Sequence, residues 1–503
     1  MKRGLFLVLA LAAVSVASAA GVPLRIVVYH TNDIHGWIMP RPDKVRPERL
    51  AGGAAALASV IAKETEPKLI VDAGDWWQGT PEGSLTKGEA LAEVFNAIGY
   101  DALAVGNHEY DAGVGSLRAL IGKMKAPVLS ANTYGTDGKR VSWVKPWAIK
   151  DVAGVKVGLF GLTTAFMPRL AFAKNIEGLH FRREVDEARE TVSELKRAGA
   201  EVVIVLSHLG YEEEGRPKFE GDQTLAREVP GIDLIVGSHS HTVLNRPVRD
   251  PVNKTLIVQA GSYLLRVGRA TLTIEPKTHR VLASEDELIE LWPDRAGEDV
   301  RVKAIVDKQV AVAGKIFEMV VATAAASLTR EAARESGLGS WMADCYKDWA
   351  GVDAAFQNGG GIRADISPGP VTLRTLYSVM PFDNALVKLK MKGAVLREIL
   401  EHGVGLARIL QIGGPSVVFR RGKPFGERLV SAEVGGSPIE DGKTYSVATL
   451  DFIVSGGDGY NAFDRADSRE LTGILARDVL RRCAEKQKTV VPPPAGRLKI
   501  KED

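Results

Sequence analysis

The feature that most constrains this chain is a series of short β-rich runs that each end directly in Asp, Asn or His. They are residues 24–29 before His30-Thr31-Asn32-Asp33, residues 68–71 before Asp72-Ala73-Gly74-Asp75, residues 202–206 before Ser207-His208, and residues 234–236 before Gly237-Ser238-His239. Helical runs separate them, an alternation typical of layered α/β domains. Because such folds place binding and catalytic residues in the loops at strand ends, we expect these polar side chains to form one site.

The chain is long enough for more than one domain, since 503 residues exceed the size of an ordinary single domain. The α/β alternation ends near residue 295, and residues 296–317 follow as a charged amphipathic pattern without strand signals. We therefore expect an N-terminal α/β domain at residues 20–295, a linker helix at residues 296–319 and a C-terminal α+β domain at residues 320–503.

The first residues carry the pattern of a secretory signal. Lys2 and Arg3 precede an apolar run over residues 5–16, and the small residues Ala17-Ser18-Ala19 follow. Cleavage after Ala19 gives a signal peptide at residues 1–19 and predicts an exported protein, periplasmic or secreted. The apolar run is short for a membrane span, and no later stretch is long and apolar enough, so no stable membrane anchor is expected.

Composition limits the partners of the chain. The 65 basic and 62 acidic residues leave a net charge of +3, and no lysine- or arginine-rich block is present to bind a nucleic-acid polymer. Any anionic substrate is therefore expected to be a small molecule. Cys345 and Cys483 could pair in an exported protein, and the sequence does not decide this; the favoured alternative is that Cys345, in a helical stretch, is simply packed. The oligomeric state stays open.

Five of the nine histidines follow β-runs or lie in glycine-flanked loops, each near an oxygen ligand. The segments are Asp33-Ile34-His35, Gly74-Asp75, Gly106-Asn107-His108-Glu109, Ser207-His208 and Gly237-Ser238-His239-Ser240-His241. Each alone is weak, because an isolated histidine is more often structural and an Asp after Gly is often a turn residue. Together they predict a binuclear metal site, and oxygen and imidazole ligands without thiolate suit Zn, Mn, Fe or Co. Two such ions, roughly 3.5–4 Å apart, activate a shared water for attack on a phosphoryl group.

This ordered series resembles the signature of the calcineurin-like metallophosphoesterases and covers the N-terminal half. The resemblance implies a four-layer α/β/β/α domain that binds two divalent ions. Its ligands would be Asp33, His35, Asp75 and His241 for one ion, and Asp75, Asn107, His208 and His239 for the other, with Asp75 bridging. The chain departs from related nucleotidases at His241, where Gln or Asn is common.

His108 and Asp111 are the candidate catalytic residues. His108 follows the proposed ligand Asn107, and we expect its imidazole to face the phosphate or the leaving oxygen. Asp111, three residues on, can orient this imidazole and raise its pKa. The resemblance implies the same catalytic dyad.

The C-terminal half carries candidate substrate-binding residues. In Asn358-Gly359-Gly360-Gly361-Ile362-Arg363, bare backbone can approach a ligand while the guanidinium takes an anion, although a turn with a solvated arginine is equally compatible. Phe382 and Phe452 lie in loop-like surroundings rich in Gly, Pro and Asn. An isolated Phe usually belongs to a core, but two in such loops are candidates for a clamp on a flat ring.

These segments resemble the C-terminal domain of the 5′-nucleotidase and UDP-sugar hydrolase family, so the resemblance spans nearly the whole mature chain. It implies that the second domain rotates about the linker helix and binds a nucleotide. The implied substrate residues are Phe382 and Phe452 around the base, Asn384 at the base edge, Asp458 on the ribose hydroxyls, Arg363 on the phosphate, and Asn358 in the same loop. Arg330 and Arg334 fall where further phosphate-binding arginines are common, although a solvated helix start explains them equally well.

The expected function is an exported, metal-dependent 5′-nucleotidase that hydrolyses nucleoside 5′-phosphates in nucleotide catabolism. UDP-sugar hydrolysis, or 2′,3′-cyclic-nucleotide phosphodiesterase with 3′-nucleotidase activity, is an alternative on the same scaffold. A related exported family that acts on carrier-bound sulfur intermediates differs at the third motif, so Asn107-His108-Glu109 argues against it. A non-catalytic nucleotide-binding protein is the alternative of another class, and the complete set of metal ligands argues against it.

Overall fold

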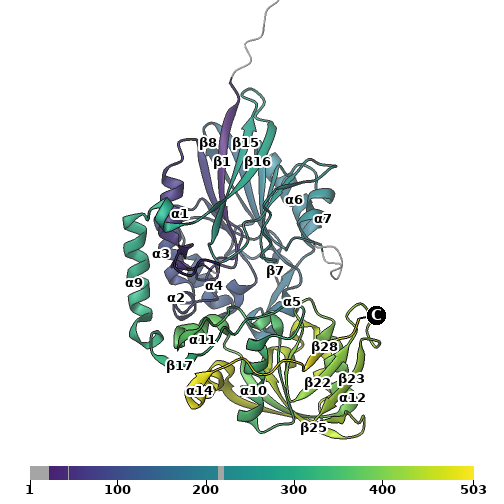
Figure 1. The fold of residues 1–503 in the computed structure, drawn as a ribbon. Helices are drawn as coiled ribbons and strands as arrows, with labels where there is room; N and C mark the ends of the chain where they lie inside the picture. Colours follow the sequence, from purple (N-terminus) through teal and green to yellow (C-terminus); the bar gives the residue numbers. More distant parts are fainter. Residues whose placement is uncertain (1–21, 44, 213–219, 503) are drawn as a thin grey trace, which may run out of the picture.

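The computed structural model describes residues 22–43, 45–212 and 220–502, so the expected signal peptide at residues 1–19 lies outside the described part. Figure 1 shows two domains, one above the other. The upper, N-terminal domain contains two six-stranded sheets. Across the first, the strands are β16 (Val281–Glu290), β15 (Arg266–Ile274), β1 (Leu24–Thr31), β4 (Lys68–Asp72), β5 (Ala102–Ala104) and β6 (Val128–Leu129). Across the second, they are β13 (Val248–Arg249), β14 (Leu256–Val258), β12 (Leu234–Gly237), β11 (Val202–His208), β9 (Val155–Thr163) and β8 (Trp147–Val152).

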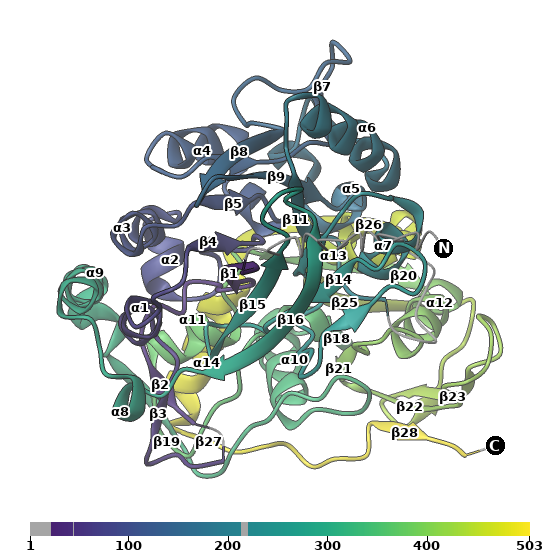
Figure 2. The ribbon, with the colours of Figure 1, turned by 90° about the horizontal axis from the view of Figure 1, so that it is seen from above.

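Helices cover the outer faces of both sheets (Figure 2). The first sheet shares a buried core with α1 (Ala54–Ala62), α3 (Glu89–Ile98) and α9 (Val300–Phe317), and the second with α6 (Glu184–Arg197) and α7 (Asp222–Glu228). A third core, which includes Val28 and Leu206, lies between the sheets. The order helix, sheet, sheet, helix confirms the expected four-layer domain. Because both faces of the central strands are covered, β1, β4 and β11 are buried over most of their length.

Parallel pairing brings the carboxyl ends of the central strands to one edge. β1 pairs in parallel with β4, where Thr31 lies beside Asp72, and β11 pairs in parallel with β12, where Ser207 lies beside Gly237. In Figure 1, β1 runs from the top of the molecule toward the C-terminal domain. The loops that carry the polar motifs therefore meet where the two domains face each other.

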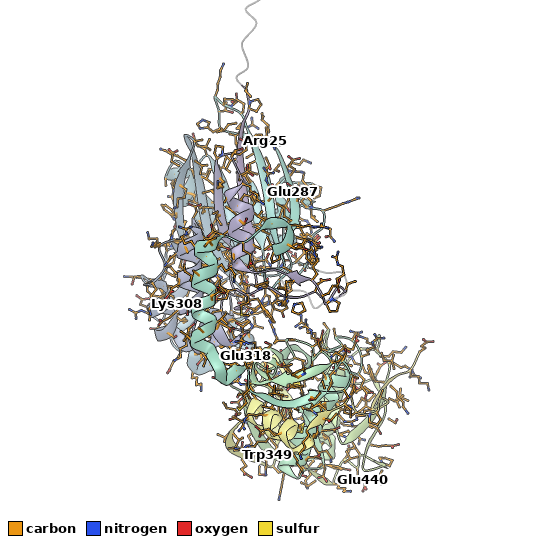
Figure 3. All side chains as sticks on the ribbon, turned by 60° about the vertical axis from the view of Figure 1, so that its left-hand side comes forward. Arg25, Glu287, Lys308, Glu318, Trp349 and Glu440 are labelled. Carbon is orange, nitrogen blue, oxygen red and sulfur yellow. A yellow bond between two sulfur atoms is a disulfide. The ribbon has the colours of Figure 1, made fainter. Side chains whose placement is uncertain are left out.

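The helix α9 fills residues 300–317 of the expected linker and lies along the side of the N-terminal domain (Figure 3). Its residues Val302 and Val306 are buried in the core shared with α1 and α3. Near the end of the helix, Gly314 leaves helical geometry with φ 45° and ψ −154°. A left-handed φ is accessible to glycine without a steric penalty, so the chain can turn there before β17 (Val320–Ala324).

The C-terminal domain is built on a mixed five-stranded sheet. Its strands, in order, are β21 (Gln411–Gly413), β18 (Ala354–Gln357), β25 (Thr444–Leu450), β20 (Ala385–Lys392) and β26 (Ser468–Leu475). Three helices pack with this sheet into one core: α10 (Gly337–Ala350), α12 (Gly393–Val404) and α14 (Ala476–Gln487). Further β-structure includes the four-stranded sheet β24-β23-β22-β28 (Ser437–Pro438, Leu429–Val434, Pro415–Phe419, Leu498–Ile500).

Cys345 of α10 and Cys483 of α14 form a disulfide, with their Cα atoms 5.7 Å apart. The two cysteines therefore pair, which the sequence left open, and the alternative that Cys345 is only a packed side chain is wrong, although Cys345 is also buried in the core. The two cysteines are 138 residues apart in sequence, and only the packing of α10 against α14 brings them together. Among the described residues, no helix has the length and apolar character that crossing a membrane would require.

Candidate active site

Two groups of potential metal ligands lie side by side at the strand ends. The first is Asp33, His35 and His241, and the second is Asp75, His208 and His239; within each group the ligand atoms lie within 4.8 Å of one another. In the first group, His35 Nε2 lies 3.0 Å from His241 Nε2, which lies 3.5 Å from Asp33 Oδ1. Residues from loops more than 200 positions apart in sequence thus converge on one point.

Asn107 completes the second group, and Asp75 joins the two. His208 Nε2 lies 3.3 Å from Asp75 Oδ2 and 3.1 Å from Asn107 Oδ1, and His239 Nδ1 lies 2.8 Å from the same amide oxygen. Asp75 Oδ2 is also 3.7 Å from His35 Nε2 of the first group. One carboxylate oxygen therefore faces both groups, which is the position of a bridging ligand.

Backbone carbonyl groups fix the orientation of two of these imidazoles. His35 Nδ1 lies 2.8 Å from the carbonyl oxygen of Gln78, and His208 Nδ1 lies 2.9 Å from that of Ala73. Because a carbonyl oxygen only accepts, each Nδ1 carries a proton, and each Nε2 is the ring atom that faces the site and is free to bind a cation. Metal-binding histidines are commonly held in this way, so the donor set fits two divalent cations.

The ligands share an unusual backbone conformation. Five of them have a positive φ: Asp33 (50°), His35 (51°), Asp75 (62°), His239 (69°) and His241 (57°). For residues with a Cβ this region costs of order 1–3 kcal/mol each, so the surrounding structure stabilises the loops against that cost. Two glycines allow the loops to approach closely, since a Cβ at Gly74 would lie 2.7 Å from His208 Nδ1 and one at Gly106 would lie 2.3 Å from Asp75 Oδ1.

Glu109 joins two of the ligand loops. Its buried carboxylate accepts hydrogen bonds from the backbone N–H groups of Asp75 (2.9 Å), Trp76 (2.7 Å) and Gly106 (2.7 Å). Burial and the nearby Asp75 raise the pKa of Glu109 to about 7. Sequence reasoning assigned this residue no role, because its partners are backbone groups that no side-chain pattern reveals.

His108 and Asp111 form the expected pair. His108 Nδ1 lies 2.8 Å from Asp111 Oδ2, and the backbone N–H of His108 donates to Asp75 Oδ1 at 2.9 Å. Burial alone lowers the pKa of His108, but the carboxylates of Asp111 and Asp75 outweigh burial and raise that pKa above its ordinary value. The imidazole therefore lies beside the metal ligands, with its Nδ1 bound to a carboxylate.

Two residues of the C-terminal domain reach this centre from the opposite side. Arg363 Nη2 lies 3.2 Å from His35 Nε2, and the ring of Phe382 lies 5.7 Å from that of His108, between centroids. Arg363 and Phe382 are themselves neighbours, with the guanidinium carbon 5.8 Å from the centre of the ring. The structure thus brings a guanidinium and an aromatic ring of one domain against the metal ligands of the other.

The other candidate residues of the C-terminal domain lie around a second loop. Asn358 Nδ2 donates to Asp458 Oδ2 at 2.7 Å, and Asp458 has a left-handed φ of 54°. Phe452 is half-buried, and a Cβ on Gly457 would lie 2.6 Å from its ring, so glycine is needed beneath it. Asn384 is buried, and its backbone carbonyl accepts from the N–H of Ala476 at 2.8 Å.

The two additional arginines have different surroundings. Arg330 donates through Nη1 to the backbone carbonyl of Arg363, and its Nε lies 3.6 Å from Asp365. Arg334, by contrast, has a side chain 70% exposed and lies 3.3 Å from Glu331. In this arrangement Arg330 lies next to Arg363, whereas Arg334 points to solvent.

Tyr263 is a site residue that sequence reasoning missed. Its ring lies 5.3 Å from that of His241 and 5.7 Å from that of His35, and its hydroxyl donates to the carbonyl of Arg363 at 3.4 Å. Burial raises the pKa of Tyr263, but the arginines around it, Arg363 first, lower it to about 8. Tyr263 follows β14 by five residues, so the rule of polar residues at strand ends, applied to this strand, could have found it.

Comparisons with known proteins place this arrangement in a family. The calcineurin-like phosphoesterase family matches residues 26–243, and the 5′-nucleotidase C-terminal domain family matches residues 313–465. A snake venom 5′-nucleotidase from Gloydius brevicauda is 30% identical over 544 residues, which cover 97% of this chain and 90% of the relative. The chain belongs to the 5′-nucleotidase family.

Solved structures agree with this assignment. The structure of a 5′-nucleotidase precursor from Thermus thermophilus has a TM-score of 0.87 at 31% identity and covers 95% of this chain and 100% of its own. A Thermus thermophilus sulfate thiohydrolase has a TM-score of 0.78 at 20% identity over 94% of this chain and 96% of its own, which shows a shared fold alone. The expected two-domain architecture and a hydrolase of the metallophosphoesterase class are thus confirmed for this 5′-nucleotidase family member.

Proposed function

We propose that this 5′-nucleotidase family member is an exported, metal-dependent enzyme that hydrolyses nucleoside 5′-phosphates to nucleoside and phosphate. The observation that carries the proposal is the juxtaposition of Arg363 and Phe382 with the metal ligands. An anion-binding guanidinium and an aromatic ring suited to a base lie beside a site built for phosphoester chemistry. A nucleotide is the small molecule that carries both a phosphate and a flat base.

Seven residues would hold the two divalent ions: Asp33, His35, Asp75 and His241 one of them, and Asp75, Asn107, His208 and His239 the other. Such ions activate water and neutralise charge that develops on phosphoryl oxygens. The oxygen and nitrogen donors favour Zn, Mn, Fe or Co. His241 adds a second imidazole nitrogen to that of His35, so the first site has one more nitrogen donor than it would have with an oxygen-donating Gln or Asn at this position.

The chain's own residues would position the substrate and manage charge. Arg363 would bind phosphoryl oxygens, with Arg330 as a further contact, whereas Arg334 is exposed and is not assigned to the phosphate. His108, bound through Nδ1 to Asp111, would present its Nε2 proton to the phosphoryl group or the leaving oxygen. For the nucleoside, we assign the base to Phe382, Phe452 and Asn384, and the ribose hydroxyls to Asp458 with Asn358.

Two observations support export. The disulfide between Cys345 and Cys483 is typical of proteins in oxidising compartments, and a relative is found in snake venom. The N-terminal pattern of Lys2, Arg3 and an apolar run ending in small residues agrees with them. Expression of the full chain followed by N-terminal sequencing of the exported protein tests this part, and a mature N-terminus at Ala20 is the expected result.

Phosphate release from a panel of nucleotides, with metal content measured on the same sample, tests the activity. We expect nucleoside 5′-monophosphates to be preferred, activity to be lost with a chelator, and Mn or Co to restore it. Asp75→Asn is the inactive control, since it removes the negative charge of the side chain that faces both metal groups and replaces one of its two oxygens by an NH2 group. Preference for 2′,3′-cyclic nucleotides or UDP-sugars would contradict the proposal, and tight binding of AMP without phosphate release would indicate a nucleotide-binding protein.

A further inference from the structure

A loop of the N-terminal domain touches the proposed base site of the C-terminal domain. The loop connects β9 (Val155–Thr163) to β10 (Leu179–Phe181) and carries α5 (Met167–Leu170) and Phe172. The ring of Phe172 lies 6.0 Å from that of Phe452, between centroids, with the planes at 85°. A perpendicular pair at this distance is a favourable aromatic arrangement.

The loop is held at points on either side of Phe172. Met167 is completely buried in the core beneath the first sheet, and Asn175 Nδ2 donates to the backbone carbonyl of Asp111 at 2.8 Å. The helix α5 also packs against residues 457–459, the turn that contains Asp458. Phe172 is therefore fixed relative to the His108–Asp111 pair of its own domain, and it contacts the nucleoside loop of the other.

The contacts of Phe452 within its own domain show why the contact with Phe172 can fix the orientation of its ring. Three atoms of its ring lie 2.6–2.7 Å from where a Cβ on Gly457 would be, so the Gly457 backbone covers part of one face of the ring. Phe452 is only half-buried and packs against its own core from the domain surface. A ring with one covered face and a perpendicular neighbour has fewer orientations, and stacking with a base requires one defined orientation.

We propose that Phe172 is a positioning residue for the base: it holds the Phe452 ring in the orientation that stacks with the nucleobase when the base site faces the metal ligands. The proposal rests on the proposed function, since it assigns the base to Phe452. It makes recognition of the base depend on both domains. A substrate with a base would then use a contact that a phosphate ester without one cannot use.

The test compares two substrates in the metal-loaded, full-length enzyme: AMP, and ribose 5-phosphate, which has no base. Phe172→Ala is expected to lower kcat/KM for AMP about 3- to 10-fold, the range of one aromatic pair, and to change kcat/KM for ribose 5-phosphate less than 2-fold. Phe172→Tyr, which keeps the ring, is expected to restore AMP hydrolysis. Phe172→Leu keeps most of the side-chain volume without the aromatic ring, and it replaces the alanine variant in this test if that variant folds poorly.

Two controls separate positioning from a general structural effect. In a Phe452→Leu background, Phe172→Ala is expected to cause no further loss with AMP, because the partner ring is already absent. Trp349→Ala removes a half-buried aromatic residue on the far side of the same C-terminal domain (Figure 3) and is expected to leave the ratio between the substrates unchanged.

Equal losses with both substrates, or an unchanged kcat/KM for AMP in Phe172→Ala, would overturn the assignment of Phe172 while leaving the nucleotidase itself intact. A wild-type enzyme that releases no phosphate from AMP, or that does not distinguish AMP from ribose 5-phosphate, would instead overturn the proposed function and the role of Phe172 with it. The wild-type measurement therefore tells the two failures apart.

Discussion

Replacement of Glu109 by glutamine tests how the two ligand loops are held together. The carboxylate of Glu109 accepts three buried backbone N–H groups, with Oε2 bound to Asp75 and Gly106 and Oε1 bound to Trp76. A glutamine side chain has one oxygen acceptor and one NH2 donor. Whichever way the amide lies, its NH2 group faces at least one backbone N–H that loses its partner.

The number of hydrogen bonds lost in Glu109→Gln sets the expected loss of stability. A buried donor left without a partner costs roughly 1–3 kcal/mol, and the bonds that remain lose the contribution of a charged acceptor. The affected loops carry Asp75 and Asn107, so the cost falls on the metal-bound arrangement. If about 2 kcal/mol of this free-energy cost is lost from metal binding, the metal affinity falls about 30-fold. That value lies within the roughly 10- to 100-fold loss typical when a group that orients metal ligands is replaced.

The assay is metal retention during dialysis against graded chelator, with metal content and phosphate release measured together. Glu401→Gln is a matched control, because the buried Glu401 carboxylate also accepts three backbone N–H groups, from Gly426, Arg428 and Leu429, all at 2.8 Å. We expect both variants to lose thermal stability but only Glu109→Gln to lose metal affinity. Metal affinity within 2-fold of wild type in Glu109→Gln would refute the reasoning, as would equal metal loss in the control.

Three further substitutions test other parts of the site and fold. His108→Ala should lower turnover about 10²- to 10⁴-fold with both metals retained, whereas loss of metal would make His108 a ligand. Phe382→Ala should raise KM for AMP about 5- to 100-fold, the range of base stacking, and an unchanged KM would place the base elsewhere. Joint replacement of Cys345 and Cys483 by serine should lower the free energy of unfolding in urea by about 4–5 kcal/mol, because the disulfide closes a long loop across 138 positions. A loss below about 1 kcal/mol would show that the unfolded chain is not restrained by the link.

The strands and the helix that could be predicted from the sequence are those whose hydrophobic pattern lies within one short stretch of the chain. The runs at residues 24–29 and 202–206 are strands because they are apolar and short, and their polar ends meet because parallel strands end at one edge. The helix expected at residues 296–317 begins at Val300; of the valines in its apolar pattern, Val302 and Val306 are buried, whereas Val300 and Val312 are exposed.

The features that escaped prediction depend on tertiary contacts. The left-handed backbone of His35 and Asp75 cannot be predicted from residue types that adopt it only occasionally, and Glu109 acts through backbone groups. Tyr263 reaches the metal ligands from a strand end whose motif contains neither Asp nor His. The disulfide requires α10 and α14 to pack together, which no spacing between two cysteines reveals.

Arg363 lies between the C-terminal domain and the metal ligands of the N-terminal domain, where the phosphate of the proposed substrate would bind. Its Nη2 atom lies 3.2 Å from His35 Nε2, a proposed ligand of a divalent cation. With a divalent ion bound by His35, a guanidinium held about 4 Å from that ion would be repelled by about 2 kcal/mol in water, and by about 8 kcal/mol at an effective dielectric constant of 20. A phosphoryl group between the two charges turns this repulsion into two attractions. Arg374 and Glu82 also pair across the domain boundary, but through opposite charges that need no ligand. We therefore expect the approach of Arg363 to the metal ligands to depend on the substrate phosphate, and the contact between Arg374 and Glu82 not to depend on it.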